Sequence, residues 1–237
     1  MAIESLERRG GSILATLIPR DTADLLFGIQ ILGGFGLIVP MMVRNWTNVE
    51  GVSLSFFLVL LVFCGLQLSL AVSAYKAAPS RRASQACLVY GMWIVLQSLH
   101  ILVILSRGMY IWDRNDKITI IVTVVSALLV YFLRRASGSN FEDPITKSQV
   151  GMATRGIPQL MQGWKIFLVG GAGVHGFSVL VGNLNIWIRM WHLVLTKGEA
   201  SWDHNRVWML ATEMVNAFSW GLVSLIWLAW RVGWINP

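Results

Sequence analysis

The residues of this sequence that could do chemistry are ionisable and amide side chains that interrupt long apolar stretches. Arg189 and Glu213 form the clearest pair, because each lies six residues inside an apolar segment, counted from Leu195 and from Val207. If the two segments are antiparallel neighbouring helices, both side chains lie ~9 Å from the same surface at 1.5 Å per residue. The spacing therefore predicts an ion pair between two helices.

Two asparagines extend this pair along the same helices. Asn185 precedes Arg189 by four residues and Asn216 follows Glu213 by three, so each amide shares a helical face with a charge. Trp220 continues the second face, seven residues after Glu213. Such a cluster could bind a solute or carry protons, because ionisable groups in an apolar solvent are costly and usually functional. It could equally join the two helices by hydrogen bonds of ~1 kcal/mol.

The composition places these residues in a membrane. Of the 237 residues, 55% are hydrophobic and only 13% are charged, and the mean hydropathy is +0.62. A soluble domain carries about a quarter charged residues. The apolar blocks reach the roughly 20 residues that a helix needs to cross the hydrocarbon core. We therefore expect an all-α, multi-pass integral membrane protein with the lipid bilayer as a partner and with Arg189 and Glu213 as an intramembrane charge pair.

Six segments are predicted to span the bilayer, and a seventh is ambiguous. The six are residues 24–43, 54–75, 86–105, 118–133, 176–195 and 207–232. The seventh, 148–169, carries Arg155, Gln159 and Gln162 at helical spacing, a polar face that lipid would reject. This segment either spans the bilayer with that face toward a cavity or enters the bilayer without crossing it.

An internal repeat favours seven spans. Two runs contain a glycine, a proline and a tryptophan separated by seven and then six residues: Gly33, Pro40 and Trp46, and Gly151, Pro158 and Trp164. A Gly-x-Ser sequence follows each run, at 51–53 and 176–178, which assigns a seven-residue insertion to the second loop. The repeat predicts two parallel three-helix units, 24–106 and 148–232, joined by a linker helix within 107–135. Residues 1–23 would be an N-terminal tail or an interfacial helix.

The prolines of the two runs occupy equivalent places in the predicted units. A proline inside a helix removes one backbone hydrogen bond and bends the helix. Equivalent bends at Pro40 and Pro158 could gate a central cavity. The two prolines could also simply end their helices, although their symmetric placement favours hinges.

This layout resembles the PQ-loop family, which includes the SWEET sugar carriers and the cystinosin-like exporters. The resemblance covers roughly residues 24–232 and is carried by VPMMVRNWTNVEGVSLSFFL and by GIPQLMQGWKIF, which contains the dipeptide Pro158-Gln159. The first unit has Pro-Met where the family has Pro-Gln. In the SWEET branch an asparagine on the third helix of each unit contacts the sugar. The resemblance implies this role for Asn216, and Gln97 stands in the corresponding helix of the first unit.

The resemblance implies a transporter that moves a small polar solute, such as a sugar, an amino acid or a similar metabolite, by alternating access. Its central site would lie between the two units. The residues expected to bind the solute are Asn185, Asn216, Gln97, Trp220 and Gln159. A receptor or adaptor on the same fold is the alternative, as the resemblance of KDEL receptors to this family permits. The sequence leaves open whether the chain forms a homo-oligomer.

Other classes of function are not favoured. The net charge of +7 is spread between apolar blocks and gives no basic face for nucleic acid. No HExxH, GxSxG or Walker sequence is present, so we expect no enzyme. Cys64 and Cys87 lack zinc-site spacing, so we expect no metal and no cofactor. The excess of Lys and Arg on the side of the N-terminus would place that terminus in the cytosol, whereas the family resemblance implies the opposite.

Overall fold

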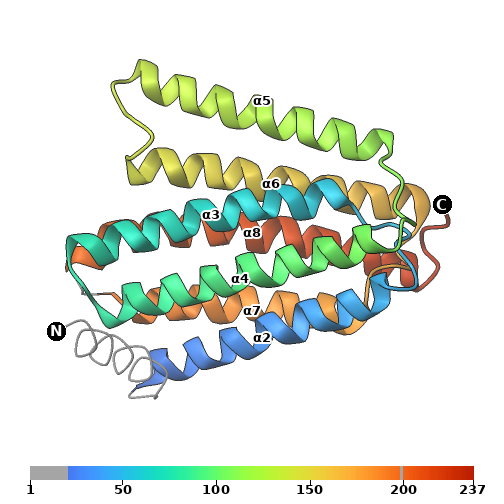
Figure 1. The fold of residues 1–237 in the computed structure, drawn as a ribbon, viewed down its shortest axis with the longest axis horizontal. Coiled ribbons are helices and arrows are strands. Elements are labelled where there is room, and N and C mark those ends of the chain that lie inside the picture. The colour runs from blue at the N-terminus through green and yellow to red at the C-terminus, as the bar shows by residue number, and fades with distance from the viewer. Residues whose placement is uncertain (1–20, 198–199) are drawn as a thin grey trace.

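The computed structural model describes residues 21–197 and 200–237, and within these ranges the regular structure is helical. Residues 1–20, most of the expected tail or interfacial helix, lie outside the described part. The described helices are α2 (Thr22–Asn45), α3 (Leu54–Ala77), α4 (Arg81–Ser106), α5 (Arg114–Ala136), α6 (Pro144–Val169), α7 (Gly176–Leu195) and α8 (Ala200–Arg231). Successive helices run in opposite directions along one bundle (Figure 1). We call the end where α2 begins the N-side end and the end that holds the C-terminus the C-side end.

Five of these helices are long and apolar enough to cross a membrane: α2, α3, α4, α5 and the part of α8 from Asn205 to Arg231. The outer face of α5 carries apolar side chains every four residues that are 58–61% exposed: Ile121, Val125, Leu129 and Leu133. Such a stripe is stable in lipid and costly in water. The all-α architecture with apolar, outward-facing helices agrees with a membrane protein.

Helices α6 and α7 do not meet the same apolar criterion. Both are still long, with 26 and 20 residues, which correspond to ~39 and ~30 Å of helix. Their polar side chains are largely buried in the bundle, among them Gln159 and Gln162 on α6 and Asn185 and Arg189 on α7. The low hydropathy of these two helices therefore comes from residues that face protein rather than lipid.

Side-chain caps explain why several helices begin earlier than hydropathy predicts. The first backbone N–H groups of a helix lack partners within it, and a preceding Asp or Ser oxygen can accept from them. Asp21, Ser53, Ser80, Asp113 and Asp143 do so at the starts of α2, α3, α4, α5 and α6. The polar first turns of α4 and α5 fall outside the apolar windows, so hydropathy alone starts these helices several residues too late.

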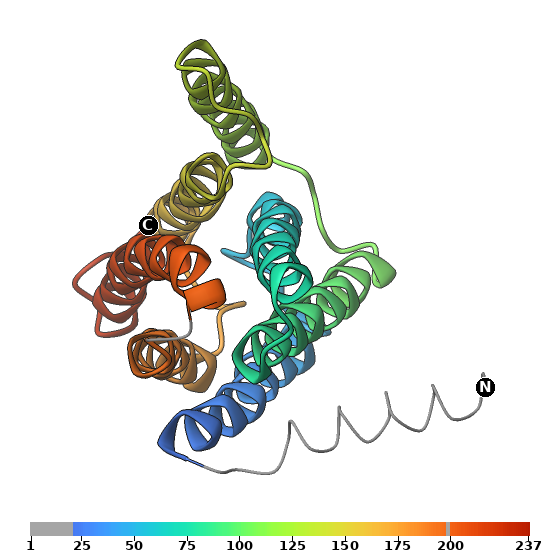
Figure 2. The ribbon, with the colours of Figure 1, turned by 90° about the vertical axis from the view of Figure 1, so that its left-hand side faces the viewer.

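The helices pack in two clusters that share one pattern of contacts. Helix α4 packs against both α2 and α3, and α8 packs against both α6 and α7. The clusters meet where α2 contacts α7 and where α3 contacts α6. Helix α5 lies at the edge of the bundle, mainly against α6 (Figure 2).

The structure corrects the expected loop insertion. Helix α6 continues eleven residues past Pro158 to Val169, whereas α2 continues five residues past Pro40 to Asn45. The connection after α6, residues 170–175, is shorter than the connection after α2, residues 46–53. The seven-residue difference between the two runs therefore lies mainly in helix α6, which continues for more turns after its proline than α2 does. The alternative that the prolines end their helices is also wrong, since both lie inside continuous helices.

The Gly-x-Ser match is likewise not equivalent in the two places. Ser53 caps α3 with its side chain, whereas the N-cap position of α7 is His175, which makes no side-chain capping hydrogen bond, and Ser178 lies inside the first turn of α7. The residues that correspond in position to 51–53 are therefore 173–175. Sequence similarity located the right connection but shifted it by three residues.

The connections after α2 and α6 touch each other, and Gly51 lies at their contact. Its φ of 72° is a conformation that side chains disfavour, and a Cβ there would lie 2.0 Å from the carbonyl oxygen of Gly170. The backbone N–H of Gly173 donates to the carbonyl of Glu50 at 2.8 Å. The close approach of the two connections depends on these glycines.

We expect Gly51→Ala to lower the free energy of unfolding by at least ~1–3 kcal/mol, because it combines a strained φ with a backbone clash. Thermal unfolding of the purified protein in detergent measures this. Gly91→Ala is the control, because a Cβ at that α4 position meets nothing within 4 Å and alanine favours a helix. Equal melting temperatures for wild type and Gly51→Ala would contradict the close contact.

Candidate functional site

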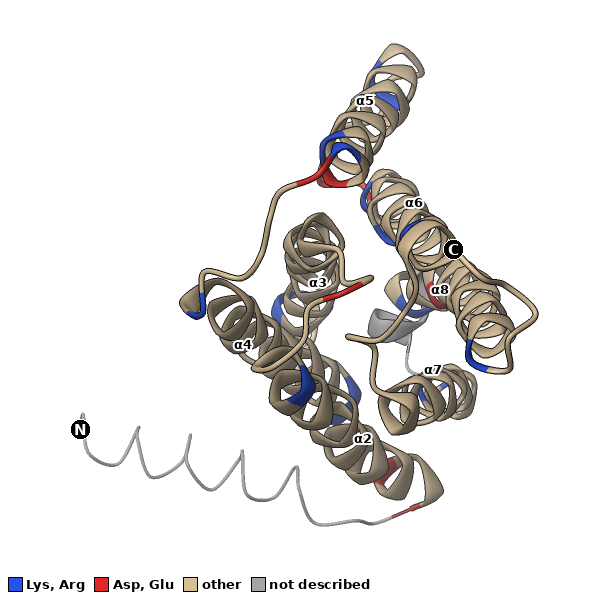
Figure 3. Cartoon of the chain, turned by 90° about the vertical axis from the view of Figure 1, so that its right-hand side faces the viewer, with Lys and Arg blue, Asp and Glu red and all other residues tan. Residues whose placement is uncertain are grey.

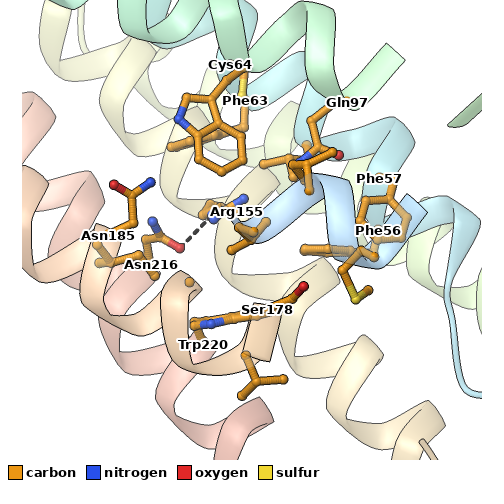
Figure 4. Close-up of a pocket in the computed structure, with 18 of the residues that line it drawn as sticks. Phe56, Phe57, Phe63, Cys64, Gln97, Arg155, Ser178, Asn185, Asn216 and Trp220 are labelled. Carbon is orange, nitrogen blue, oxygen red and sulfur yellow. Dashed lines mark hydrogen bonds between the residues drawn. The ribbon is translucent and has the colours of Figure 1, made fainter. Parts of the chain in front are cut away.

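A cavity of about 50 Å³ lies in the centre of the bundle. Its lining residues come from α2, α3, α4, α6, α7 and α8 and from the connection before α7. Much of the wall is aromatic: Phe56, Phe57, Phe63, Trp93 and Trp220 (Figure 4). The cavity therefore lies between the two helix clusters, not within either one.

Several side chains that line this cavity carry unpaired polar atoms. Seven buried polar atoms of its lining residues have no hydrogen-bond partner among the residues that the structure describes: Trp93 Nε1, Gln97 Oε1, Arg155 Nη1, Ser178 Oγ, Asn185 Oδ1, Arg189 Nε and Trp220 Nε1. A buried polar group left without a partner costs about 1–3 kcal/mol. Several such groups around one cavity are suited to hold a polar solute.

The carboxylate of Glu213 is the centre of a buried hydrogen-bond network. Glu213 is fully buried on α8, and Arg189 of α7 donates to its Oε1 at 2.8 Å. Tyr90 of α4 donates to the same oxygen at 3.1 Å. Asn216 donates to Oε2 at 2.6 Å. The ion pair expected from the depth of Arg189 and Glu213 is thus present, and it also connects the two helix clusters through Tyr90.

Asn216 extends this network to α6. Its Oδ1 accepts from Arg155 Nε at 2.6 Å and from Gln159 Nε2 at 2.9 Å. Ser219 in turn donates to the oxygen of Gln159. Asn216 therefore uses its oxygen to orient two side chains of α6 and its nitrogen to hold Glu213.

The structure brings most of the expected solute-binding residues to one place. Asn185, Asn216, Gln97 and Trp220 line the cavity, and so does Arg189. Gln159 does not line it, because this fully buried side chain lies behind Asn216 and Ser219. Pro40 and Pro158 lie in α2 and α6 and do not line the cavity either.

Three further residues take part and were not among the expected solute-binding residues. Trp93 and Tyr90 belong to α4, where positions 90, 93 and 97 fall on one helical face. Their spacing from Gln97 could have indicated that Tyr90 and Trp93 lie on the same face of α4 as this expected solute-binding residue. Arg155 lines the cavity from the polar face of α6 that lipid would reject.

At the C-side end, contacts to backbone atoms close the space between the two clusters. Gln162 of α6 accepts from Ser53 N at 2.8 Å and donates to the carbonyl of Gly51. Asn45 of α2 donates to the carbonyl of Gly173 at 2.8 Å. Figure 3 views the bundle from this end.

Asp116, at the start of α5, adds a second closing contact at the same end. It pairs with Lys165 of α6 at 3.2 Å and accepts from Ser53 Oγ and Ser55 Oγ, both at 2.8 Å. Tyr110 also donates to Asp116. Burial and this hydrogen bond hold the pKa of Tyr110 well above its ordinary value, so its hydroxyl stays protonated and remains a donor.

At the N-side end, side chains connect the two helix clusters. Lys147 of α6 donates to Ser69 Oγ of α3 at 3.0 Å. Leu193 and Met209 of the second cluster belong to an apolar core with Leu70 and Ala74 of the first. The contacts that close the two ends thus differ: the C-side end has hydrogen bonds to backbone atoms as well as the ion pair of Asp116, whereas the N-side end has side-chain contacts.

Within the described residues no group of three or more His, Cys, Asp or Glu side chains is placed to hold a metal ion. A scan against protein-family models matched none of them. Searches of curated proteins and of solved structures found no match. The function proposed below therefore rests on the residues of this chain and their geometry.

We expect Glu213→Gln to reduce the free energy of unfolding by about 3–5 kcal/mol, because it leaves Arg189 as a buried, unpaired charge. Combining it with Arg189→Met should cost less than the sum of the two single losses. Unfolding of purified variants in mixed micelles measures both. Glu50→Gln, the same chemical change at an exposed position, should leave stability unchanged. Strictly additive losses would contradict the coupling of the pair.

Proposed function

We propose that the chain is a membrane transporter that moves a small polar solute by alternating access through the central cavity. In this proposal all seven described helices span the bilayer. Helices α2, α3 and α4 form a first unit, α5 is a linker, and α6, α7 and α8 form a second, parallel unit. The PQ-loop resemblance of the sequence motifs supports the same arrangement.

The observation that carries the proposal is the set of seven unpaired polar atoms around one cavity between the two clusters. A packed structural core satisfies its polar groups internally, because each unpaired one is destabilising. Unpaired polar groups on side chains that line one cavity are suited to a ligand. Transporters built from repeats place their binding site at the interface of the repeats.

The repeated pattern of contacts supports the two-unit arrangement. In each cluster the helix that comes third in the chain packs against both others: α4 against α2 and α3, and α8 against α6 and α7. An odd number of spans per unit requires a linker to give both units the same orientation, and α5 occupies that position. Its edge location and exposed apolar face fit this role.

The positions of the prolines support a gate at the C-side end. On α6, Pro158 lies between Arg155, which lines the cavity, and Gln162, which closes the end. On α2, Pro40 lies between Leu37, which lines the cavity, and Asn45, which closes the end. A bend at either proline would separate the closing contacts, and at Pro40 it would also move Met41, which lines the cavity.

Counterflow in proteoliposomes tests the proposal. The purified chain is reconstituted, and uptake of labelled glucose, glycine, lactate and benzoate is measured against liposomes without protein. We expect saturable uptake of at least one of the four. Binding of solutes without uptake of any of them would instead support a receptor or adaptor and would overturn the transporter proposal. The absence of both binding and uptake would overturn it as well.

The hinge role predicts a loss of rate without a loss of binding. We expect Pro40→Ala and Pro158→Ala each to slow uptake roughly tenfold, which corresponds to ~1.4 kcal/mol in the barrier, while solute affinity stays unchanged. Pro144→Ala is the matched control, because Pro144 lies in the first turn of α6, where no backbone hydrogen bond is lost. Wild-type rates in both hinge variants would rule the hinge role out.

A further inference from the structure

Arg155 is a cation in the cavity wall without a carboxylate partner among the described residues. The charged residues that line the cavity are Arg155 and Arg189. Arg189 is paired with Glu213 at 2.8 Å. The contacts of Arg155 are neutral: its Nε donates to Asn216 at 2.6 Å, and its guanidinium lies 5.1 Å from the ring centre of Phe63. Its Nη1 is buried and has no partner among the described residues.

Within the described residues, no hydrogen bond or ion pair joins Arg155 to Glu213, whose bonds go to other donors. Its Oε1 accepts from Arg189 and Tyr90, and its Oε2 accepts from Asn216. The two guanidinium groups and one carboxylate therefore leave the centre of the bundle with one excess positive charge. An unpaired charge in a site of low polarity is costly, and an anion that binds against it relieves that cost.

We propose that the solute is a small organic acid with one carboxylate, which pairs with Arg155 at Nη1. This inference rests on the proposed function and names its substrate class. The aromatic wall would pack against the body of the solute, and the unpaired oxygens of Gln97 and Asn185 would accept from a hydroxyl or N–H on it. One carboxylate matches the single excess charge.

Other solute classes fit the charges less well. A neutral sugar leaves Arg155 uncompensated. An amino acid brings an ammonium group as well as a carboxylate, and no free carboxylate lines the described cavity to pair with it. A solute with two negative charges would exceed the single positive charge available.

Matched pairs of an acid and its amide test the charge requirement. Binding of lactate and lactamide, and of benzoate and benzamide, is measured by calorimetry on the purified full chain, and uptake is measured in proteoliposomes. A hydrogen bond to a charged group contributes about 1.5–3 kcal/mol, so we expect at least one acid to bind roughly 10- to 100-fold more tightly than its amide.

Variants of Arg155 assign this preference to one side chain. Arg155→Gln should bring the affinity for the acid close to that for the amide, while Arg155→Lys should keep part of the preference. Arg114→Gln removes an exposed guanidinium at the start of α5 and should change neither the affinity for the acid nor the affinity for the amide. Elution as a single species and an unchanged melting temperature without solute show that the variants fold. If Arg155→Gln does not fold, comparing the affinities of the acid and the amide for wild type and for Arg155→Lys still tests whether the preference for the acid depends on this side chain.

The possible failures of the two proposals differ. Uptake of glucose or glycine without any preference for acids would overturn the carboxylate class and leave the transporter. Binding of an acid that depends on Arg155, without uptake, would leave the carboxylate site and overturn the transporter. Arg155→Gln binding acids as tightly as wild type would overturn the assignment of Nη1. Neither binding nor uptake of any solute would overturn both proposals.

Discussion

The carboxylate of Glu213 is the interaction on which the centre of this bundle depends. It pairs with Arg189 of α7 and accepts from Tyr90 of α4. Asn216, which donates to it, in turn accepts from Arg155 of α6. Burying one ion is prohibitive, and burying a pair is tolerable only when its remaining lone pairs are satisfied. Because three donors satisfy Glu213, helices of low hydropathy such as α6 and α7 can pack where lipid would reject them.

The buried polar atoms of the described residues fall into two groups, those with hydrogen-bond partners and those without. Glu213, Asn216, Gln159 and Ser219 satisfy one another and fix the spacing of α6 and α8. Other polar atoms on side chains that line the cavity stay unpaired among the described residues. Asn216 belongs to the first group and also lines the cavity. A structural role for this residue therefore does not compete with a role in binding.

Sequence reasoning predicted the interactions that depend on depth along a helix and missed those that depend on how distant segments meet. Arg189 and Glu213 could be paired because two adjacent antiparallel helices fix their relative height. The bond from Tyr90 to Glu213 crosses from one cluster to the other, and no spacing within a helix encodes that distance. The contact of Gln162 with Gly51 depends on the length of α6 beyond Pro158, and aligning the Gly-x-Ser sequences assigned that length to a loop.

The position of Arg155 connects charge to motion in the proposed transporter. Arg155 lies three residues before Pro158, and its Nε is already held by Asn216. A carboxylate at Nη1 would pull the same side chain toward the cavity, in competition with the contact to Asn216. The part of α6 that this contact fixes lies directly before the bend, and Gln162 lies directly after it. In the proposed mechanism, neutralising this charge would act on the part of α6 next to Pro158, where a bend would open the C-side end. Binding of a solute would then be coupled to the gate without a long path through the protein.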